Sequence, residues 1–413
     1  MARAARRVGG ASACTPVRAG ALGTNAKYSH KPEFIDPDTG EITGGKPRHE
    51  PMAGRLQRFA LQATARTILP KSRTAKCLRL RAHKQDITVW KSKEHGTASY
   101  AGLQTCGSVW SCPVCAAKIA ERRRVEIIHA MDAHKAQGGL VSLLTLTTPH
   151  QRLDNLGDLL AKQAKALHRF WSDRGTKAVF EAMGVLGQIR ALEVTHGRNS
   201  PQNNGWHPHY HVLVFHGVAG DLEGWGESLY LRWAECCKRA GLGEPSRAHG
   251  LKLHDGSKAA AYASKWGLED EMTKGHTKKA KAGGETPFDL LRAAMADRQD
   301  KQAMALFREF AECFKGKRQL SWSNGLKARF FVDEKTDEEL AAEKDDRAVL
   351  LGLLTVDQWR DVLKVDGRGV LLDIAAKGGW HNVQRYLWLI EGAREGVQLD
   401  PELLQEARVL LTS

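Results

Sequence analysis

The sequence predicts an α+β protein with a central antiparallel sheet and helices packed on one face of it. The first observation is the order of apolar segments, with a strand at 140–148, a helix at 153–180 and two further strands at 186–195 and 206–215. The second is the stretch at 197–205, whose Gly, Asn, Ser and Pro residues are typical of a turn. Short connections favour antiparallel pairing, and helices between such strands pack on the sheet.

Composition limits the class of protein. The 413 residues carry a formal net charge of +15 and are 42% hydrophobic, so the chain can fill a core and favours a polyanionic partner such as nucleic acid. No apolar run approaches the roughly 20 residues that span a bilayer, and residues 1–23 lack the apolar stretch of a signal peptide. We therefore predict a cytoplasmic protein without a membrane partner, whose cysteines are metal ligands or buried thiols rather than disulfides.

Four regions follow one another along the chain. Residues 1–54 lack apolar periodicity and are rich in Gly, Ala, Arg and Pro, which predicts a disordered basic arm. Residues 55–125 are predicted to form a zinc-binding module with flanking helices, and residues 126–335 the domain that contains the sheet. Residues 336–413 show apolar residues at helical spacing and predict a helical C-terminal region. Docking on the sheet domain, dimerisation and reading of DNA all remain open as roles for that last region.

The other elements follow from the same periodicity. Apolar residues three and four apart predict helices, and a short run of β-branched and aromatic residues predicts a strand. The further helices expected are 55–69, 116–137, 222–240, 257–267 and 288–314, and the further strand is 87–90.

Three histidines, His207, His209 and His211, occupy alternate positions of one predicted strand. Alternate side chains project from the same face of a strand, and imidazoles on a rigid strand make a good site for a divalent metal. A hairpin centred near Pro201 sets Glu193 opposite His209, where a buried carboxylate needs a partner. We predict that His209, His211 and Glu193 hold Mg²⁺ or Mn²⁺, with His207 as a supporting residue or possible ligand. The alternative is a surface strand with solvated histidines.

Tyr262 and Lys265 are three residues apart in an alanine-rich segment and share one face of a helix. A tyrosine hydroxyl can attack a phosphodiester and retain the 5′-phosphate as a covalent link. A neighbouring lysine can steady the phosphate or lower the pKa of the phenol. The pair therefore predicts a nucleophile and its assistant. An ordinary amphipathic helix with a half-buried tyrosine is the alternative, and the histidine strand upstream favours catalysis.

Four cysteines, Cys77, Cys106, Cys112 and Cys115, fall within one region, and the last two are separated by two residues. Four thiolates satisfy the tetrahedral preference of zinc, so we predict a structural Zn²⁺ site. Cys77 is separated from the rest, and His95 is the alternative fourth ligand. A redox-active CxxC pair is less favoured, because no βαβ pattern surrounds it.

A basic run, Arg122, Arg123 and Arg124, lies on the predicted helix 116–137. Such a run can face the phosphate backbone of DNA or can be a solvated helix surface. We retain both interpretations and name the three arginines as candidate DNA-binding residues.

Taken together, these segments resemble the replication initiators of rolling-circle plasmids, within the superfamily of HUH endonucleases. The resemblance covers about residues 75–330. Thr145-Leu146-Thr147 is similar to the first motif of the family, the histidine strand to the second and Tyr262 to Lys265 to the third, while segments 106–115 and 322–327 are similar to flanking family segments. The resemblance implies a palm-like sheet. It also implies that Tyr262 nicks one strand at a plasmid double-strand origin, leaving a 5′-phosphotyrosine link and a 3′-hydroxyl primer.

The resemblance also implies partners and leaves alternatives. The partners are plasmid origin DNA, single-stranded or extruded as a hairpin, and the host helicase and polymerase. Some family members have a glutamate four residues before the tyrosine, where this chain has Lys258, so the terminating cleavage is not explained. A transposase or conjugative relaxase with the same chemistry is one alternative function, and a non-catalytic zinc-dependent DNA-binding protein is another.

Overall fold

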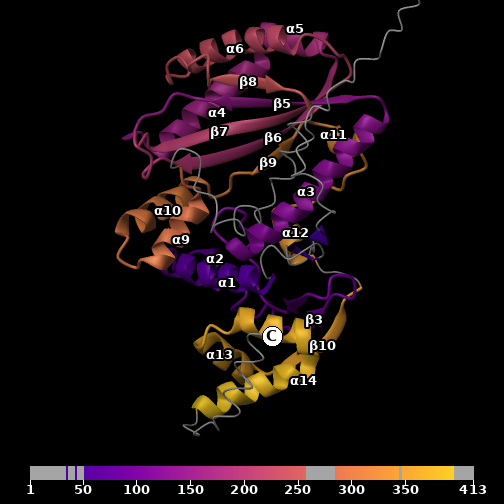
Figure 1. Ribbon diagram of the computed structural model, residues 1–413, viewed down its shortest axis with the longest axis vertical. Coiled ribbons are helices and arrows are strands. Elements are labelled where there is room, and N and C mark those ends of the chain that lie inside the picture. Colours follow the sequence, from indigo (N-terminus) through magenta and orange to yellow (C-terminus); the bar gives the residue numbers. More distant parts are fainter. Residues whose placement is uncertain (1–33, 36–41, 44–50, 257–283, 344–346, 395–413) are drawn as a thin grey trace, which may run out of the picture.

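The computed structural model describes residues 34–35, 42–43, 51–256, 284–343 and 347–394. Its main sheet has five antiparallel strands in the order β8-β5-β7-β6-β9, and it fills the upper part of Figure 1. The strands are β5 (Leu140–Thr147), β6 (Val185–His196), β7 (Trp206–His216), β8 (Leu251–His254) and β9 (Leu320–Trp322). The predicted α+β class with an antiparallel sheet is confirmed. The sequence pattern missed β8 and β9, which are only four and three residues long.

One face of the main sheet is covered by α4 (Leu156–Ser172) and α6 (Leu222–Arg239), as predicted. Helix α4 buries Leu159, Leu167 and Phe170 at helical spacing in the same core as Leu146 of the sheet. The helix predicted at 153–180 is two helices, because the side chain of Asp173 caps the start of α5 (Arg174–Ala182) by accepting a hydrogen bond from the Thr176 amide.

The opposite face of the main sheet is divided into an apolar half and a polar half. In the apolar half, Leu143, Leu213 and Phe215 pack against Ile127 and Met131 of α3 (Pro113–Ala136). A helix therefore covers part of this second face too, in addition to the helices on the first. The short helix α11 (Leu326–Arg329) contributes to the same core. The polar half carries His207, His209 and His211 of β7.

A second sheet joins the cysteine-rich region to the C-terminal region. Its order is β10-β3-β4, so that β10 (Val349–Leu354) pairs with β3 (Ile87–Lys91), and β4 (Ala98–Ala101) follows. The leucines of 349–354 were predicted to be helical, but they form a strand because β3 offers them an edge. The rest of the region is helical as predicted, in α12 (Asp337–Ala342), α13 (Val356–Lys364) and α14 (Arg368–Arg394).

The elements between these two parts are α1 (Pro51–Ile68), α2 (Arg73–Lys76), α9 (Pro287–Ala296) and α10 (Lys301–Cys313). A two-residue pair, β1 (Phe34–Ile35) with β2 (Ile42–Thr43), precedes them in the chain. The helix predicted at 288–314 is divided into α9 and α10, because Asp300 caps the second of them. Among the described helices, none combines the length and the apolar character that crossing a membrane requires.

Candidate functional site

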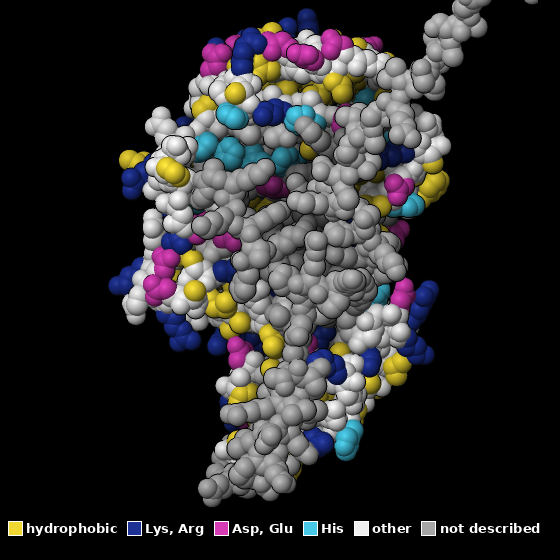
Figure 2. All heavy atoms as spheres, viewed as in Figure 1, with side chains coloured by type: hydrophobic (Ala, Val, Ile, Leu, Met, Phe, Trp, Pro, Cys, Tyr) yellow, Lys and Arg dark blue, Asp and Glu magenta, His cyan; other side chains and the backbone are white. Residues whose placement is uncertain are grey.

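The hairpin of β6 and β7 has the register that its sequence predicts. Glu193 pairs with His209, and the same alignment continues to Thr195 opposite His207. On its other side β7 pairs with β5, where Thr145 lies opposite His211. Paired residues of antiparallel strands project from the same face, so these side chains share the polar half of the sheet. In Figure 2, histidine side chains form a cyan band across the upper part of the molecule, where Figure 1 shows the main sheet.

The carboxylate of Glu193 lies between the two imidazoles predicted to be ligands. Its Oε2 atom is 3.4 Å from His209 Nε2 and 3.7 Å from His211 Nε2. The other ring nitrogens are engaged: His209 Nδ1 is 3.2 Å from the carbonyl oxygen of His207, and His211 Nδ1 is 3.1 Å from Thr145 Oγ1. Because a carbonyl oxygen only accepts, His209 donates from Nδ1, and in the neutral ring the lone pair is then on Nε2, toward Glu193.

This arrangement fits a divalent cation. One atom each from Glu193, His209 and His211 lies within 4.8 Å of the others. Hydrogen bonds to Nδ1 orient metal-ligating histidines in proteins, and both rings have such a partner here. A mixed set of two imidazoles and one carboxylate leaves coordination positions for water or a phosphate oxygen, as Mg²⁺ and Mn²⁺ require.

His207 lies beside this three-residue set and is not part of it. Its Nδ1 atom is 3.2 Å from Nδ1 of His150, and the two rings are 4.5 Å apart between centroids. Burial, reinforced by the surrounding histidines, lowers the pKa of His207 to about 3, so the ring is neutral at pH 7. Sequence reasoning missed His150, because it follows β5 as an isolated histidine in a loop.

A turn at 150–154 rests directly on the chain that enters β7. Gly205 has a φ of +74°, and a Cβ atom there would lie 2.9 Å from the carbonyl oxygens of Gln151 and Arg152. The turn is closed by Asp154, whose carboxylate accepts a hydrogen bond from the Gln151 amide at 2.7 Å. Gly205 is therefore required both by its left-handed backbone and by close contact with the turn.

We expect Gly205→Ala to lower the free energy of unfolding by about 1–3 kcal/mol more than Gly243→Ala does. Gly243 also has a positive φ, of +81°, but nothing lies within 4 Å of a Cβ added there. Gly243→Ala therefore introduces the same kind of backbone strain but no steric clash of the added Cβ atom. Urea unfolding of both variants measures the difference, and equal losses would contradict the close contact between Gly205 and the turn.

Three predicted positions, Tyr262, Lys265 and Lys258, lie outside the described residues. The roles of Tyr262 as nucleophile and of Lys265 as its assistant therefore stay predictions. The same holds for Lys258 as the residue that replaces the family glutamate.

The candidate DNA-binding arginines contact acidic groups of the protein itself. Arg122 is 2.6 Å from Glu343, Arg123 is 2.9 Å from Glu126, and Arg124 is 2.7 Å from Glu121. Their side chains are only 16%, 12% and 18% exposed, respectively. These pairs favour the interpretation that the run stabilises α3 and its contacts, and DNA binding by it remains untested.

The four predicted cysteines form one buried cluster. Cys115 Sγ lies 3.5 Å from Cys77 Sγ and 3.6 Å from Cys106 Sγ, while Cys112 Sγ lies 3.8 Å from Cys77 Sγ. A tetrahedral site with Zn–S bonds of about 2.3 Å places its sulfurs about 3.8 Å apart. The spacing therefore fits zinc, with Cys77 rather than His95 as the fourth ligand.

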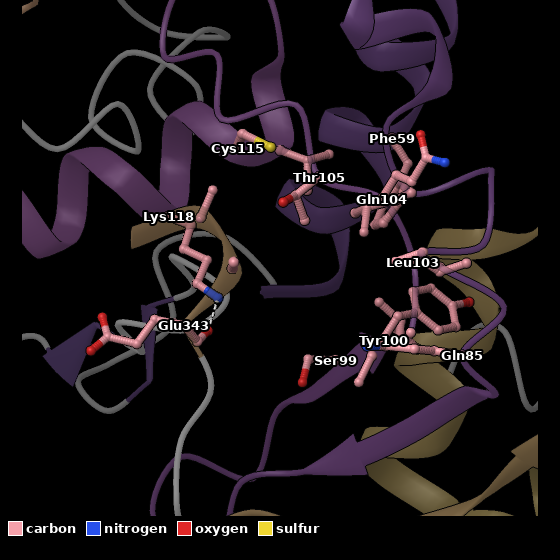
Figure 3. A pocket seen from close by; sticks show the side chains of 18 of the residues that line it. Phe59, Gln85, Ser99, Tyr100, Leu103, Gln104, Thr105, Cys115, Lys118 and Glu343 are labelled. Carbon is pink, nitrogen blue, oxygen red and sulfur yellow. Dashed lines mark hydrogen bonds between the residues drawn. The ribbon is translucent and has the colours of Figure 1, made fainter. Parts of the chain in front are cut away.

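A cavity of about 730 Å³ borders this cluster. It lies between α1, β4, α3 and α12, and basic side chains outnumber acidic ones in its lining. Figure 3 shows Lys118 and Glu343 on one side, with the Lys118 amine donating to the Glu343 carbonyl, and Tyr100 and Gln104 on the other. The cavity belongs to the junction of the cysteine cluster with the C-terminal region, and no residue of the histidine site lines it.

The fold and its two clusters define a class: an α+β protein with a histidine–carboxylate centre on its main sheet and a separate four-cysteine cluster. Residues 100–219 match the family model described as "Replication protein", and this match includes Glu193, His209 and His211. This part of the chain, 120 of its 413 residues, is therefore similar to the replication protein family.

Two curated relatives accompany that match. The chain is 26% identical to "Protein rep" of Streptomyces lividans, over 65% of this chain and 74% of that protein. It is 34% identical to "Neomycin resistance protein" of Streptomyces cyanogenus, over 31% of this chain and 34% of that protein, so the second match spans about a third of either chain. No solved structure matches the chain.

Proposed function

We propose that this protein initiates the replication of a plasmid by nicking one DNA strand at the double-strand origin. The observation that carries the proposal is the cluster of Glu193, His209 and His211, which falls inside the segment that matches the replication protein family. A non-catalytic DNA-binding protein has no need for two imidazoles oriented on a carboxylate. The name of the Streptomyces lividans relative supports replication over transposition or conjugative transfer.

The proposed chemistry is a transfer between two oxygens. The Tyr262 hydroxyl loses its proton and its oxygen bonds to the phosphorus of the scissile phosphodiester. The bond from phosphorus to the 3′-oxygen breaks, and that oxygen takes up a proton. The products are a 5′-phosphotyrosine link and a 3′-hydroxyl, on which a host polymerase, aided by a host helicase, extends the strand. Lys265 assists at the phosphate.

The residues of the sheet serve this reaction by holding and orienting. His209, His211 and Glu193 would hold Mg²⁺ or Mn²⁺, which polarises the phosphoryl group when bound. Thr145 and the backbone carbonyl of His207 fix the imidazole orientations through their contacts with the Nδ1 atoms. The neutral ring of His207 adds no positive charge beside them.

The proposal is tested with a single-stranded oligonucleotide carrying the origin of the host plasmid. Wild-type protein with Mn²⁺ is expected to give a covalent adduct that survives denaturing electrophoresis. Tyr262→Phe is expected to give none, because phenylalanine has no oxygen to bond to phosphorus. Tyr386→Phe, on α14, serves as the matched control and should keep the adduct. An adduct in Tyr262→Phe contradicts the assignment of the nucleophile, and absence of any nick by wild-type protein contradicts the function.

A further inference from the structure

A lysine lies on the same face of the sheet as the histidine centre. Lys252 of the edge strand β8 pairs with Thr145, and Thr145 pairs with His211. The three side chains therefore form one row across β8, β5 and β7, and the outer two backbones are roughly 10 Å apart. Lys252 is exposed, and within the described residues no carboxylate lies within ion-pair distance of it.

A second cation lies at the other end of the centre, on the turn at 150–154. Arg152 is exposed and, like Lys252, has no carboxylate partner in the part of the chain that the structure describes. The next residue, Leu153, is 93% exposed, so its apolar side chain is open to contact with a bound partner. The contact of His150 with His207 and the packing on Gly205 hold this turn against the histidine strand.

Arg198, in the turn between β6 and β7, differs from these two cations because it is paired with carboxylates. Arg198 donates to Glu285 at 2.6 Å and to Asp300 at 2.8 Å, so its charge is neutralised within the protein. Of these three described residues, only Lys252 and Arg152 therefore keep their positive charge available to a polyanion, on opposite sides of the centre.

We infer that Lys252 and Arg152 bind phosphates of a single DNA strand on either side of the histidine centre, and that Leu153 packs against an unstacked base of that strand. The inference rests on the proposed function, since the strand is the one that is nicked. Lysine and arginine supply charge to phosphates without reading the base. An apolar side chain on a rigid turn offers a surface to the face of a base once the base has left its stack.

The salt dependence of binding tests the two cations. Fluorescence anisotropy gives the affinity for a labelled single-stranded origin oligonucleotide between low and moderate salt, without divalent cation so that no nicking occurs. Each phosphate contact on a single strand contributes about 0.7 to the slope of log K against log salt. We expect Lys252→Ala and Arg152→Ala each to reduce the slope by about 0.7, and the double variant by about 1.4.

Matched controls come from α4, which lies on the other face of the sheet. Lys162 and Arg169 are exposed there, and their alanine variants should leave the slope unchanged. Leu153→Ser should lower the affinity about fivefold at an unchanged slope, because it removes an apolar contact and no charge. Unchanged slopes in both site variants, or the same reduction in the controls, overturn the inference. In that case nicking by wild-type protein still supports the proposed function. If wild-type protein neither binds nor nicks the oligonucleotide, both fail.

Discussion

Replacement of Cys112 by serine is expected to remove the bound zinc and to abolish cooperative folding of the region around it. The Cys112 side chain is fully buried, and its sulfur also accepts a hydrogen bond from Gln62 at 3.1 Å. Burial raises the pKa of Cys112, but hydrogen bonds with the other three thiols outweigh it and lower the pKa well below its ordinary value, whereas the contacts within the cluster raise the pKa of Cys77 and Cys115. Structural zinc contributes about 10–16 kcal/mol in small zinc domains, which is as large as the stability of a typical domain.

The loss should extend beyond the cluster, because Cys112 is also the residue before α3. The first turns of that helix hold Cys115 and Ala116 in the core of the cluster, and its later turns pack Ile127 and Met131 on the main sheet. If the first turns of α3 lose their packing in the cysteine cluster, the orientation of α3 on the main sheet is no longer fixed at that end. We therefore expect the histidine centre to be disturbed as well, although the cysteine cluster and the histidine centre share no residue.

Zinc content by mass spectrometry and thermal unfolding by circular dichroism measure the effect. Wild-type protein should carry one zinc per chain, and a strong chelator should reproduce the behaviour of Cys112→Ser. Cys313→Ser is the matched control, since Cys313 is a free thiol on α10 outside the cluster. A Cys112→Ser protein that unfolds at the wild-type temperature would show that the cluster holds no stabilising metal.

The histidine centre could be anticipated from sequence because two simple rules specify it. Alternation along a strand puts His209 and His211 on one face, and a turn centred at Pro201 brings Glu193 to His209. The residues that contact these histidines are distant in sequence. His150, which contacts His207, lies in a loop about 60 residues earlier. Thr145 contacts His211 because β5 pairs with β7, and the pattern of either strand alone does not determine that pairing.

The prediction of helices from apolar spacing was wrong where contacts with other parts of the fold determined the structure. The residues of β10 have leucines at spacings compatible with a helix, but the open edge of β3 pairs with them through backbone hydrogen bonds. Asp173 and Asp300 divide two predicted helices, because an aspartate that caps a new helix start is difficult to distinguish from one on the surface of a continuous helix. The cluster of four cysteines was easier to predict from the sequence, because zinc coordination restricts both their number and their spacing.

The double replacement His209→Ala with His211→Ala is expected to reduce Mn²⁺-dependent nicking of the origin oligonucleotide at least about a thousandfold, or about 4 kcal/mol of transition-state stabilisation. Both Nε2 atoms face the Glu193 carboxylate, so their loss leaves one ligand of three. Binding of the oligonucleotide without metal should change by less than about twofold, because the two imidazoles are proposed to hold the metal and not to contact phosphates. His168→Ala, on the exposed side of α4, is the control and should retain activity.

Graded variants distinguish ligands from neighbours. Glu193→Gln keeps the shape of the side chain and removes its charge, so it should weaken Mn²⁺ affinity and leave part of the activity at saturating Mn²⁺. His207→Ala should cost about tenfold or less, since this ring contacts His150 and lies outside the ligand set. Nicking rates measured across a Mn²⁺ titration separate affinity from maximal rate. Should His207→Ala prove as damaging as the double variant at every Mn²⁺ concentration, the ligand set is wrong and His207 belongs in it.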